Sequence, residues 1–150
     1  MKHLKWLLLS GMLLMLSCNS DDSTTDEETD NKLIGTWELL RHENIDGGSA
    51  NESPAGESPI TITFSPDNNY TGSTQNNEFD GEFENDEQSI ILTKFVTTAV
   101  SETEWGTTFY NALGESTQEN NLNIVLQYAI SSDSLFLKYN ETRRMLLIQK

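Results

Sequence analysis

Few side chains in this sequence have the chemistry of a catalytic or metal site. Beyond the first 17 residues, His42 is the only histidine, and Cys18 is the only cysteine in the chain. A Ser-His-Asp arrangement would need His42 to be held rigidly by its surroundings. We expect instead a solvated histidine at the edge of a loop. Zinc sites need clusters of histidine and cysteine, which the sequence lacks.

Carboxylates are plentiful, with 24 acidic against 9 basic residues, but no pattern gathers them into a site. The turns Asp46-Gly47-Gly48 and Asn85-Asp86-Glu87 lack the ligand spacing of a calcium loop. A carboxylate pair could serve glycoside hydrolysis, yet abundance alone brings some acids together. We therefore predict no enzyme, no metal and no cofactor. A hydrolytic enzyme is the alternative, and it requires a cleft with convergent acids or with His42 inside it.

Cys18 directly follows a basic and apolar N-terminal segment. Two lysines precede an apolar run from Trp6 to Leu16, and Ser17 leads into Cys18. This layout is typical of a secretory signal that is removed from the mature protein. With a cysteine at the cleavage site, the segment resembles a bacterial lipoprotein signal. In such signals the thiol receives a diacylglycerol group, and the lipidated cysteine, here Cys18, becomes the first residue.

The other interpretations of this segment fit less well. A spanning helix needs roughly 20 apolar residues, and the apolar run is 11 residues long. Plain secretion would favour a small-x-small cleavage site, which Leu16 before Ser17 does not supply. A buried structural cysteine would need a fold around it, but residues 19–31 are entirely polar. We therefore expect residues 1–17 to be a signal peptide, and a protein anchored in the outer membrane by its acyl chains, on the periplasmic or the cell-surface face.

Residues 18–31 are predicted to be the lipidated cysteine and a disordered acidic tether. The segment 19–31 holds six acids, no base and no apolar side chain, so it cannot bury enough surface to offset its ordering entropy. An unstructured chain of this length reaches roughly 20 Å. An acidic run close after the cysteine also resembles the surface-export signals of Bacteroidota lipoproteins.

The net charge excludes one class of partner. The formal charge is −15, and removal of residues 1–17 takes away two lysines and no acid, which leaves −17. Phosphate binding needs clusters of Lys and Arg, so we expect no nucleic-acid partner. Such a charge also disfavours anionic lipid, so the acyl chains must supply the membrane attachment. An envelope protein or a small apolar ligand are the remaining candidate partners.

Residues 32–150 fit one ordinary domain, and most of that range has the two-residue period of β-strands. A loop is expected at 42–59, where almost nothing can pack. The hairpin succession predicts a mainly β (α+β) fold, a strongly curved antiparallel sheet or barrel of about eight strands. The expected strands are 33–41, 60–64, 70–74, 79–83, 89–96, 122–130, 135–139 and 145–149.

One helix is expected near 101–113. Ser101 followed by Glu104 is a capping-box pattern, and Gly114 is placed to end the helix in a left-handed conformation. The apolar residues fall on one helical stripe; they are Trp105, Phe109, Ala112 and Leu113.

Five residues are candidates for a ligand-binding surface. Trp37 and Trp105 could line a cavity, or they could simply pack in the core. Phe79 and Phe83 flank Gly81 on one strand face, where they could form the wall of a shallow apolar groove. Alternatively, Gly81 relieves crowding in a bent strand.

The order of these motifs resembles the META domain, the family of HslJ-like lipoproteins. The resemblance implies a non-enzymatic β-rich domain that acts in envelope maintenance or stress tolerance. The family's Gly-Cys-Asn motif reads Gln75-Asn76-Asn77 here, and a second family cysteine, expected near Val100, is also missing. The matching segments are Gly35-x-Trp37, Ile60–Phe64, Tyr70–Gly72, Phe79–Phe83, Phe109–Leu113 and Asp133–Leu137.

A second family is also similar. The lipocalin-like domain of Bacteroidota lipoproteins likewise opens with a Gly-x-Trp strand and has a hairpin like Ile62 to Tyr70. That resemblance implies a small apolar ligand inside the barrel, in a cavity of a few hundred Å³. The helix between strands favours the META assignment, because a small lipocalin-like barrel more often passes directly from strand to strand.

Overall fold

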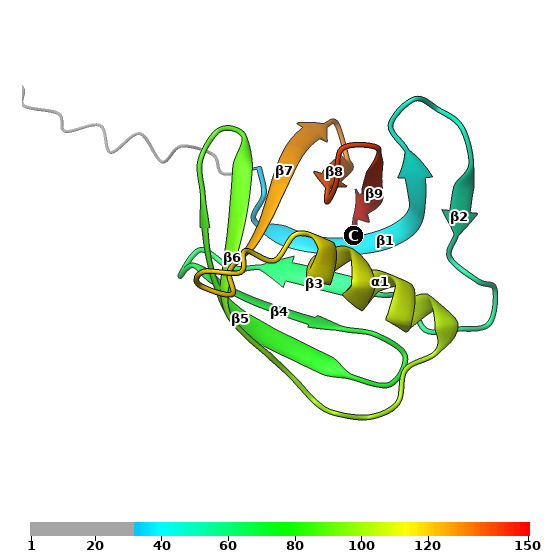
Figure 1. Ribbon diagram of the computed structural model, residues 1–150, viewed down its shortest axis with the longest axis horizontal. Helices are drawn as coiled ribbons and strands as arrows, with labels where there is room; N and C mark the ends of the chain where they lie inside the picture. Colours follow the sequence, from blue (N-terminus) through cyan, green and yellow to red (C-terminus); the bar gives the residue numbers. More distant parts are fainter. Residues whose placement is uncertain (1–31) are drawn as a thin grey trace, which may run out of the picture.

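The computed structural model describes residues 32–150, so the predicted signal peptide, Cys18 and the tether lie outside the described residues. Nine strands and one helix make up the described chain (Figure 1). They are β1 (Gly35–Asn44), β2 (Ala50–Glu52), β3 (Thr61–Phe64), β4 (Asn69–Ser73), β5 (Glu78–Asn85), β6 (Ser89–Thr97), α1 (Glu104–Glu115), β7 (Ile124–Ser131), β8 (Ser134–Lys138) and β9 (Arg143–Gln149).

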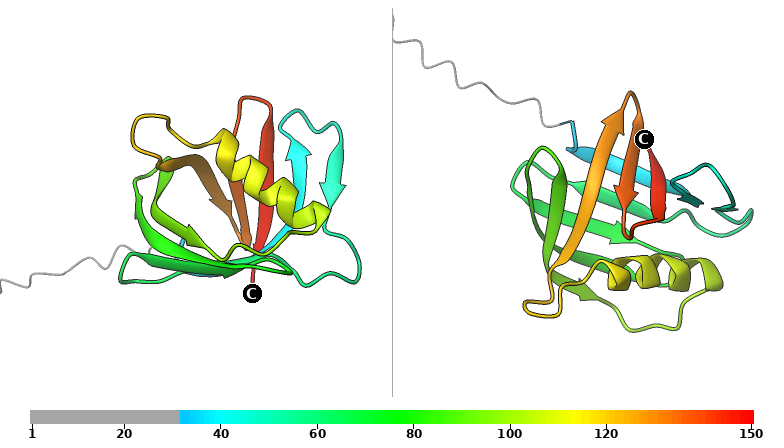
Figure 2. Two further views of the ribbon diagram at one scale, coloured as in Figure 1. Left: turned by 60° about the horizontal axis from the view of Figure 1, so that its bottom comes forward. Right: turned by 45° about the horizontal axis from the view of Figure 1, so that its top comes forward.

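The strands form a closed antiparallel barrel, which confirms the predicted fold class. From β3 to β9 each strand pairs with the next along the chain, and β1 pairs with both β3 and β9. The β1–β9 pairing closes the ring and runs from Trp37 opposite Gln149 to Asn44 opposite Arg143. Eight strands therefore make up the barrel, and β2 is an extra strand beside the second half of β1 (Figure 2).

Strand β1 is longer than the sequence predicted, and β2 lies inside the expected loop 42–59. A register shift between Leu39 and Arg41 bends β1. Before the bend β1 pairs with β3, and after it Arg41–Glu43 pair with β2. All three residues of β2 are exposed, so this strand carries no hydrophobic period and depends on backbone hydrogen bonds.

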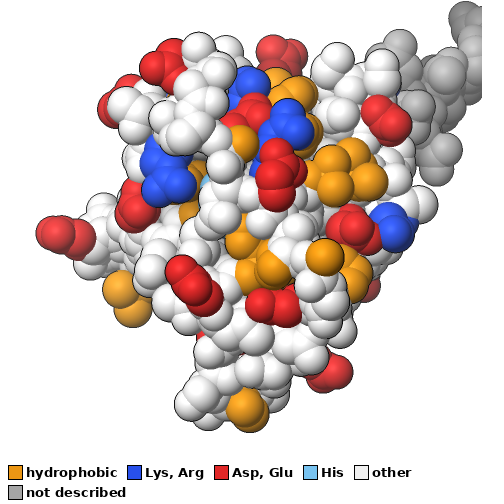
Figure 3. Space-filling model, turned by 90° about the vertical axis from the view of Figure 1, so that its right-hand side faces the viewer, with side chains coloured by type: hydrophobic (Ala, Val, Ile, Leu, Met, Phe, Trp, Pro, Cys, Tyr) orange, Lys and Arg blue, Asp and Glu red, His pale blue; other side chains and the backbone are white. Residues whose placement is uncertain are grey.

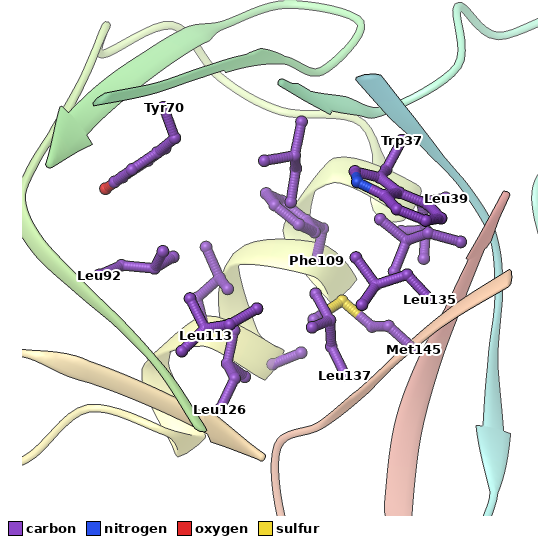
Figure 4. Packing of buried hydrophobic residues seen from close by; sticks show 14 of the residues in the cluster. Trp37, Leu39, Tyr70, Leu92, Phe109, Leu113, Leu126, Leu135, Leu137 and Met145 are labelled. Carbon is purple, nitrogen blue, oxygen red and sulfur yellow. The ribbon is translucent and has the colours of Figure 1, made fainter. Parts of the chain in front are cut away.

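The barrel interior is filled by inward-facing side chains from every strand of the ring and from α1 (Figure 4). Trp37 is fully buried, and its indole N–H donates to the backbone oxygen of Leu33 at 2.8 Å. Tyr70, Leu92 and Met145 approach from other sides of the ring. Each large apolar side chain buried here contributes about 1.5–3 kcal/mol to folding.

Helix α1 lies across the open side of the barrel (Figure 2), where it covers the gap between β6 and β7. These two strands pair only over Ser89–Leu92. Beyond Leu92, where the two strands no longer pair, the helix fills the space between them. Its apolar stripe, which includes Phe109 and Leu113, points into the core. Among the described residues, no helix has the length and hydropathy to cross a membrane.

Both predicted helix ends were wrong. The N-cap is Thr103, whose hydroxyl accepts the Gly106 N–H at 3.1 Å. Ser101 lies two residues before the cap, where Asn76 of the β4–β5 turn donates to its backbone oxygen. Gly114 lies inside the helix, and Ser116 is the C-cap. The Ser116 hydroxyl lies within hydrogen-bond distance of the Ala112 oxygen, in the last turn, and of the Tyr139 oxygen, just after β8. No left-handed glycine is therefore needed at this end.

The strand predicted to begin at Leu122 begins at Ile124 instead. Leu122 has a φ of 60° and is 76% exposed. Its N–H donates to the Gln118 oxygen, and the Gln118 N–H donates to the Asn123 oxygen. These bonds close a turn ahead of β7, so the apolar alternation at this position does not indicate burial.

Candidate functional site

The structure places the four candidate aromatic side chains in the core. Trp37, Phe79, Phe83 and Trp105 are each at most 3% exposed. A Cβ atom at Gly81 would lie 2.6 Å from both the Tyr70 hydroxyl oxygen and the Thr93 backbone oxygen. Gly81 therefore makes room for the Tyr70 ring inside the barrel rather than for a guest on its surface.

The prediction for His42 was wrong, because this histidine is an interior residue. It belongs to β1 and is 0% exposed. Its ring centroid lies 5.1 Å from that of Trp105 and 5.7 Å from that of Tyr139, with both contacts edge-on. Neither ring nitrogen has a hydrogen-bond partner among the described residues.

The surroundings of His42 keep its imidazole neutral. Burial, and next the positive charge of Arg143, lower the pKa of His42 to about 4. A general base must reach within hydrogen-bond distance of its substrate, and an enclosed imidazole cannot. The bend in β1 explains the error: because the inward period shifts by one residue between Leu39 and Arg41, His42 faces the core and Arg41 faces outward.

An ion-pair cluster covers the outer face of β1 and β9. The Glu43 carboxylate lies 2.6 Å from Arg41 Nε on its own strand and 2.6 Å from an Arg144 nitrogen across the barrel seam. Burial acts to raise the pKa of Glu43, but hydrogen bonds from the two arginines outweigh it and hold that pKa below its usual value. Arg144 also lies 4.3 Å above the Phe136 ring. The cluster thus has a structural role.

A second polar cluster joins the β4–β5 turn to the segment before α1. The Asn77 side chain accepts from the Thr98 hydroxyl and the Val100 N–H, both at 2.8 Å, and donates to the Val100 oxygen and to Glu102. Asn76 donates to the Ser101 oxygen at 2.7 Å. The two places where the META resemblance puts cysteines are therefore joined here by amide hydrogen bonds.

The Glu102 carboxylate completes this second cluster. It accepts from the Thr74 hydroxyl at 2.5 Å and sits against the first turn of α1. A Cβ atom at Gly106 would overlap Glu102, which explains a glycine inside the helix. A negative charge at a helix N-terminus is favourable, so Glu102 supports the start of α1 as well as the turn.

One pocket lies between β2 and the first turns of α1. We call it the β2–α1 groove. It has a volume of about 200 Å³ and is lined by Asn51, Glu52, Pro54, Glu57, Glu104, Trp105 and Thr108. Figure 3 faces this side of the molecule and shows acidic side chains scattered around hydrophobic ones, with Lys and Arg mainly in the upper half.

Trp105 joins the β2–α1 groove to the core, since the same indole lines the groove and contacts His42. The Trp105 Nε1 has no hydrogen-bond partner among the described residues. The groove wall is held in place by Glu57, which accepts from the Thr103 hydroxyl at 2.8 Å, and by Ser58, whose N–H donates to Gln75. Sequence reasoning missed this groove because β2 has no hydrophobic signal.

No group of three or more His, Cys, Asp or Glu side chains in 32–150 is arranged to hold a metal ion. Other pockets lie on the outside of the barrel, such as one of about 300 Å³ over β3, β4 and β5 that is lined by Thr61, Thr71 and Asp80.

The comparisons with known proteins agree with this architecture. A model of the META domain matches residues 31–150. A solved protein from Burkholderia xenovorans superposes with a TM-score of 0.57 at 18% identity, over 77% of this chain and 81% of that one. A DUF4847 family protein from Bacteroides vulgatus gives 0.56 at 18% identity, over 81% and 96%. At such identity these two structures support the fold alone. Curated protein sequences give no significant match.

Proposed function

Because the chain belongs to the META-domain family, we propose that it is a non-enzymatic lipoprotein of the bacterial envelope. The acyl chains on Cys18 hold it in the outer membrane, and the acidic segment 19–31 separates the barrel from the lipid. Its role is envelope maintenance or stress tolerance, exercised by binding an envelope partner. The anchoring part of this proposal rests on the sequence around Cys18.

The enclosure of His42 supports the non-enzymatic part. Within residues 32–150 it is the only imidazole, and there is no thiol. A side chain that is 0% exposed, with a pKa lowered to about 4, cannot take a proton from a substrate on the surface. Binding therefore accounts for the domain better than catalysis does.

The anchor is tested by the substitution Cys18→Ser. We expect the variant to leave the membrane fraction and to lose incorporation of labelled palmitate, because the hydroxyl cannot be alkylated in place of the thiol. Ser17→Ala, one residue earlier, is the matched control and should stay in the membrane. Palmitate labelling that persists in Cys18→Ser would contradict the assignment.

A closed eight-stranded barrel also suits the alternative of a lipocalin-like module for a small apolar ligand. Native mass spectrometry of the purified protein separates the two functions. A bound small molecule that is released by mild denaturation would support the alternative. A spectrum of the bare, acylated chain alone would favour the packed barrel, whose interior is filled by side chains such as Trp37 and Phe109.

A further inference from the structure

His42 and Trp105 enclose three polar atoms that have no partner. The imidazole is 0% exposed and the indole residue 3% exposed, and their ring centroids lie 5.1 Å apart in an edge-on contact. Among the described residues, neither imidazole nitrogen has a hydrogen-bond partner, and the indole N–H has none either. A buried polar group without a partner carries its full desolvation penalty. Separation of the two rings would let water bond all three atoms, so this contact has a physical reason to open.

Trp105 separates His42 from the β2–α1 groove. The indole lines that groove, which has a volume of about 200 Å³, and it also contacts the imidazole. Asn51, another lining residue, lies opposite His42 in the β1–β2 pairing. Residues that lie opposite each other on two paired strands point to the same face of the sheet. His42 therefore faces the groove, and movement of the Trp105 side chain would connect the two.

The other close neighbours of His42 are held more firmly than the indole. Tyr139 donates its N–H to the Arg143 oxygen at 3.3 Å, and the Arg143 guanidinium lies 5.8 Å above the Tyr139 ring. Met145, which lies opposite His42, belongs to the β1–β9 pairing that closes the barrel. The Trp105 indole makes no hydrogen bond within the described residues. It is therefore the neighbour that can move with the smallest loss of contacts.

The surroundings of His42 oppose its protonation while the contact is closed. Burial and the positive charge of Arg143 lower the pKa of His42 to about 4, against 6.5 for an exposed imidazole. The other side chains that contact or pair with His42 carry no charge in acid; they are Trp105 on α1, Tyr139 after β8, Met145 on β9 and Asn51 on β2. The carboxylates of Glu57 and Glu104 line the groove. A proton on the imidazole is therefore favoured once the ring reaches the water of the groove.

We propose that Trp105 is an acid-operated gate over His42. When the imidazole binds a proton, the indole leaves its place, water enters from the β2–α1 groove, and the groove gains a cationic floor. Protonation and opening are linked, because the charged ring favours the open position of the indole and the neutral ring the closed one. The imidazole of the open state already holds its proton, so it supplies no general base. The gate therefore agrees with a binding role for the domain.

The strands and the helix keep their places when the gate opens. Glu43 joins β1 to β9 through Arg144 at 2.6 Å, and its pKa, held below the usual value by the two arginines, keeps it charged as His42 gains a proton. At the two ends of α1, the Ser116 oxygen accepts the Val125 N–H at 2.9 Å, and Asn77 holds the preceding segment. Opening is therefore a side-chain movement.

Fluorine NMR of the full chain, labelled with 5-fluorotryptophan and purified in a nonionic detergent, tests the gate. Trp37 and Trp105 are the tryptophans of residues 32–150, and Trp105→Phe assigns the two signals. From pH 7 to pH 4.5 the Trp105 signal should move toward that of an exposed indole and become sensitive to exchange of H₂O for D₂O. The ratio of open to closed gate should rise roughly fiftyfold, because the exposed imidazole gains a proton that the enclosed one does not. The Trp37 signal should stay in place.

Variants identify the group that operates the gate. His42→Leu should keep the Trp105 signal at its neutral-pH position throughout. The control is the double variant Glu57→Gln and Glu104→Gln, which removes two carboxylates that line the groove and should retain the transition. His42 is the only histidine of residues 32–150, so isotope-labelled histidine reports its titration in the unaltered protein. The midpoint of that titration should coincide with the midpoint of the Trp105 movement.

Several results would overturn the proposal. They are a Trp105 signal that does not respond to pH, a transition that persists in His42→Leu, and a transition that the glutamate control abolishes. Simultaneous movement of the Trp37 and Trp105 signals would show that acid unfolds the barrel instead. If His42→Leu fails to fold, different midpoints for the histidine titration and the Trp105 movement still refute the gate. None of these measurements depends on acylation of Cys18, so the anchoring proposal is tested separately.

Discussion

At the scale of single residues, His42 shows how a polar side chain can be an interior residue in a barrel. Its ring contacts Trp105 and Tyr139. Met145 is its partner residue across the β1–β9 pairing. Burial without a partner penalises the charged imidazolium far more than the neutral ring. The position is therefore compatible with folding at neutral pH, where an imidazole is mostly uncharged even in the unfolded chain.

This arrangement makes the stability depend on pH. The folded pKa of His42, about 4, lies below the unfolded value of 6.5, so between these values the unfolded chain binds a proton that the folded chain does not. Stability should therefore be greatest above pH 6.5 and fall by about 3 kcal/mol as the pH approaches 4. Urea unfolding at several pH values measures it.

The variant His42→Leu isolates the His42 contribution. Its unfolding free energy should be flatter than that of the wild type between pH 6.5 and 4, because no imidazole remains to be protonated. Glu43 acts at lower pH, since its folded pKa lies below its usual value. If the unfolding free energies of the two proteins change with pH in parallel, His42 is not the group responsible for the pH dependence.

Two glycines give a second prediction at this scale. Gly81→Ala would bring a methyl group within 2.6 Å of Thr93 and Tyr70, and overpacking of this kind costs about 1–3 kcal/mol. Gly114→Ala meets no atom within 4 Å and lies inside α1, so it should stabilise by up to about 1 kcal/mol. Thermal unfolding of both variants checks the opposite signs, and shifts in the same direction would contradict the packing described.

At the scale of elements, α1 depends on polar contacts before its first turn as much as on its apolar stripe. The segment 98–103 has no regular structure, and Asn77 fixes it to the β4–β5 turn through bonds to Thr98, Val100 and Glu102. Glu102 in turn stands at the helix N-terminus. The turn therefore positions the helix over the open side of the barrel.

The substitution Asn77→Ala should accordingly destabilise the domain by about 2–4 kcal/mol, since it removes several bonds and leaves buried partners unsatisfied. Asn76→Ala is the matched control: its one bond to Ser101 is exposed, and its loss should cost about 1 kcal/mol or less. Chemical denaturation gives both values, and hydrogen exchange over 98–106 should rise only in Asn77→Ala. Equal losses in the two variants would show that Asn77 does not fix the segment 98–103 to the β4–β5 turn.

At the scale of the whole molecule, closure of the barrel joins the two ends of the described chain. Strand β9 pairs along most of β1, so the last residues complete what the first residues begin. The Lys150 N–H also donates to the Thr36 oxygen at 2.9 Å. The ring of strands therefore closes within residues 32–150.

Deletion of residues 19–31 should therefore leave the melting temperature of the domain unchanged within about 2 °C, a shift that corresponds to less than about 0.5 kcal/mol for a domain of this size. Calorimetry of the full mature chain and of the deletion variant measures the difference. A drop of several degrees would indicate that the acidic segment folds onto the barrel.

Much of the fold follows from local pattern. Alternating apolar residues such as Ile60, Ile62 and Phe64 can bury only one face, so a hairpin succession of them must curve into a sheet with an interior. The stripe from Trp105 to Leu113 likewise indicates one helix. The resemblance to the META domain was confirmed over residues 31–150, and the site around Cys18 stays a prediction.

The remaining features depend on contacts between residues that are distant in the sequence. His42 faces the core because β1 bends where it leaves β3 for β2, and no local signal marks that register shift. Thr103 rather than Ser101 caps α1, and Ser101 lies outside the helix, where Asn76 of the β4–β5 turn donates to its backbone oxygen. The β2–α1 groove arises where an exposed strand meets a helix that begins 52 residues further along the chain, from Glu52 to Glu104. By itself the sequence determines the hydrophobic period, and this period specifies strands, a helix and an interior. Only the folded barrel decides which polar groups that interior encloses, because the bend in β1 and the hydrogen bonds between distant segments exist only in the closed chain.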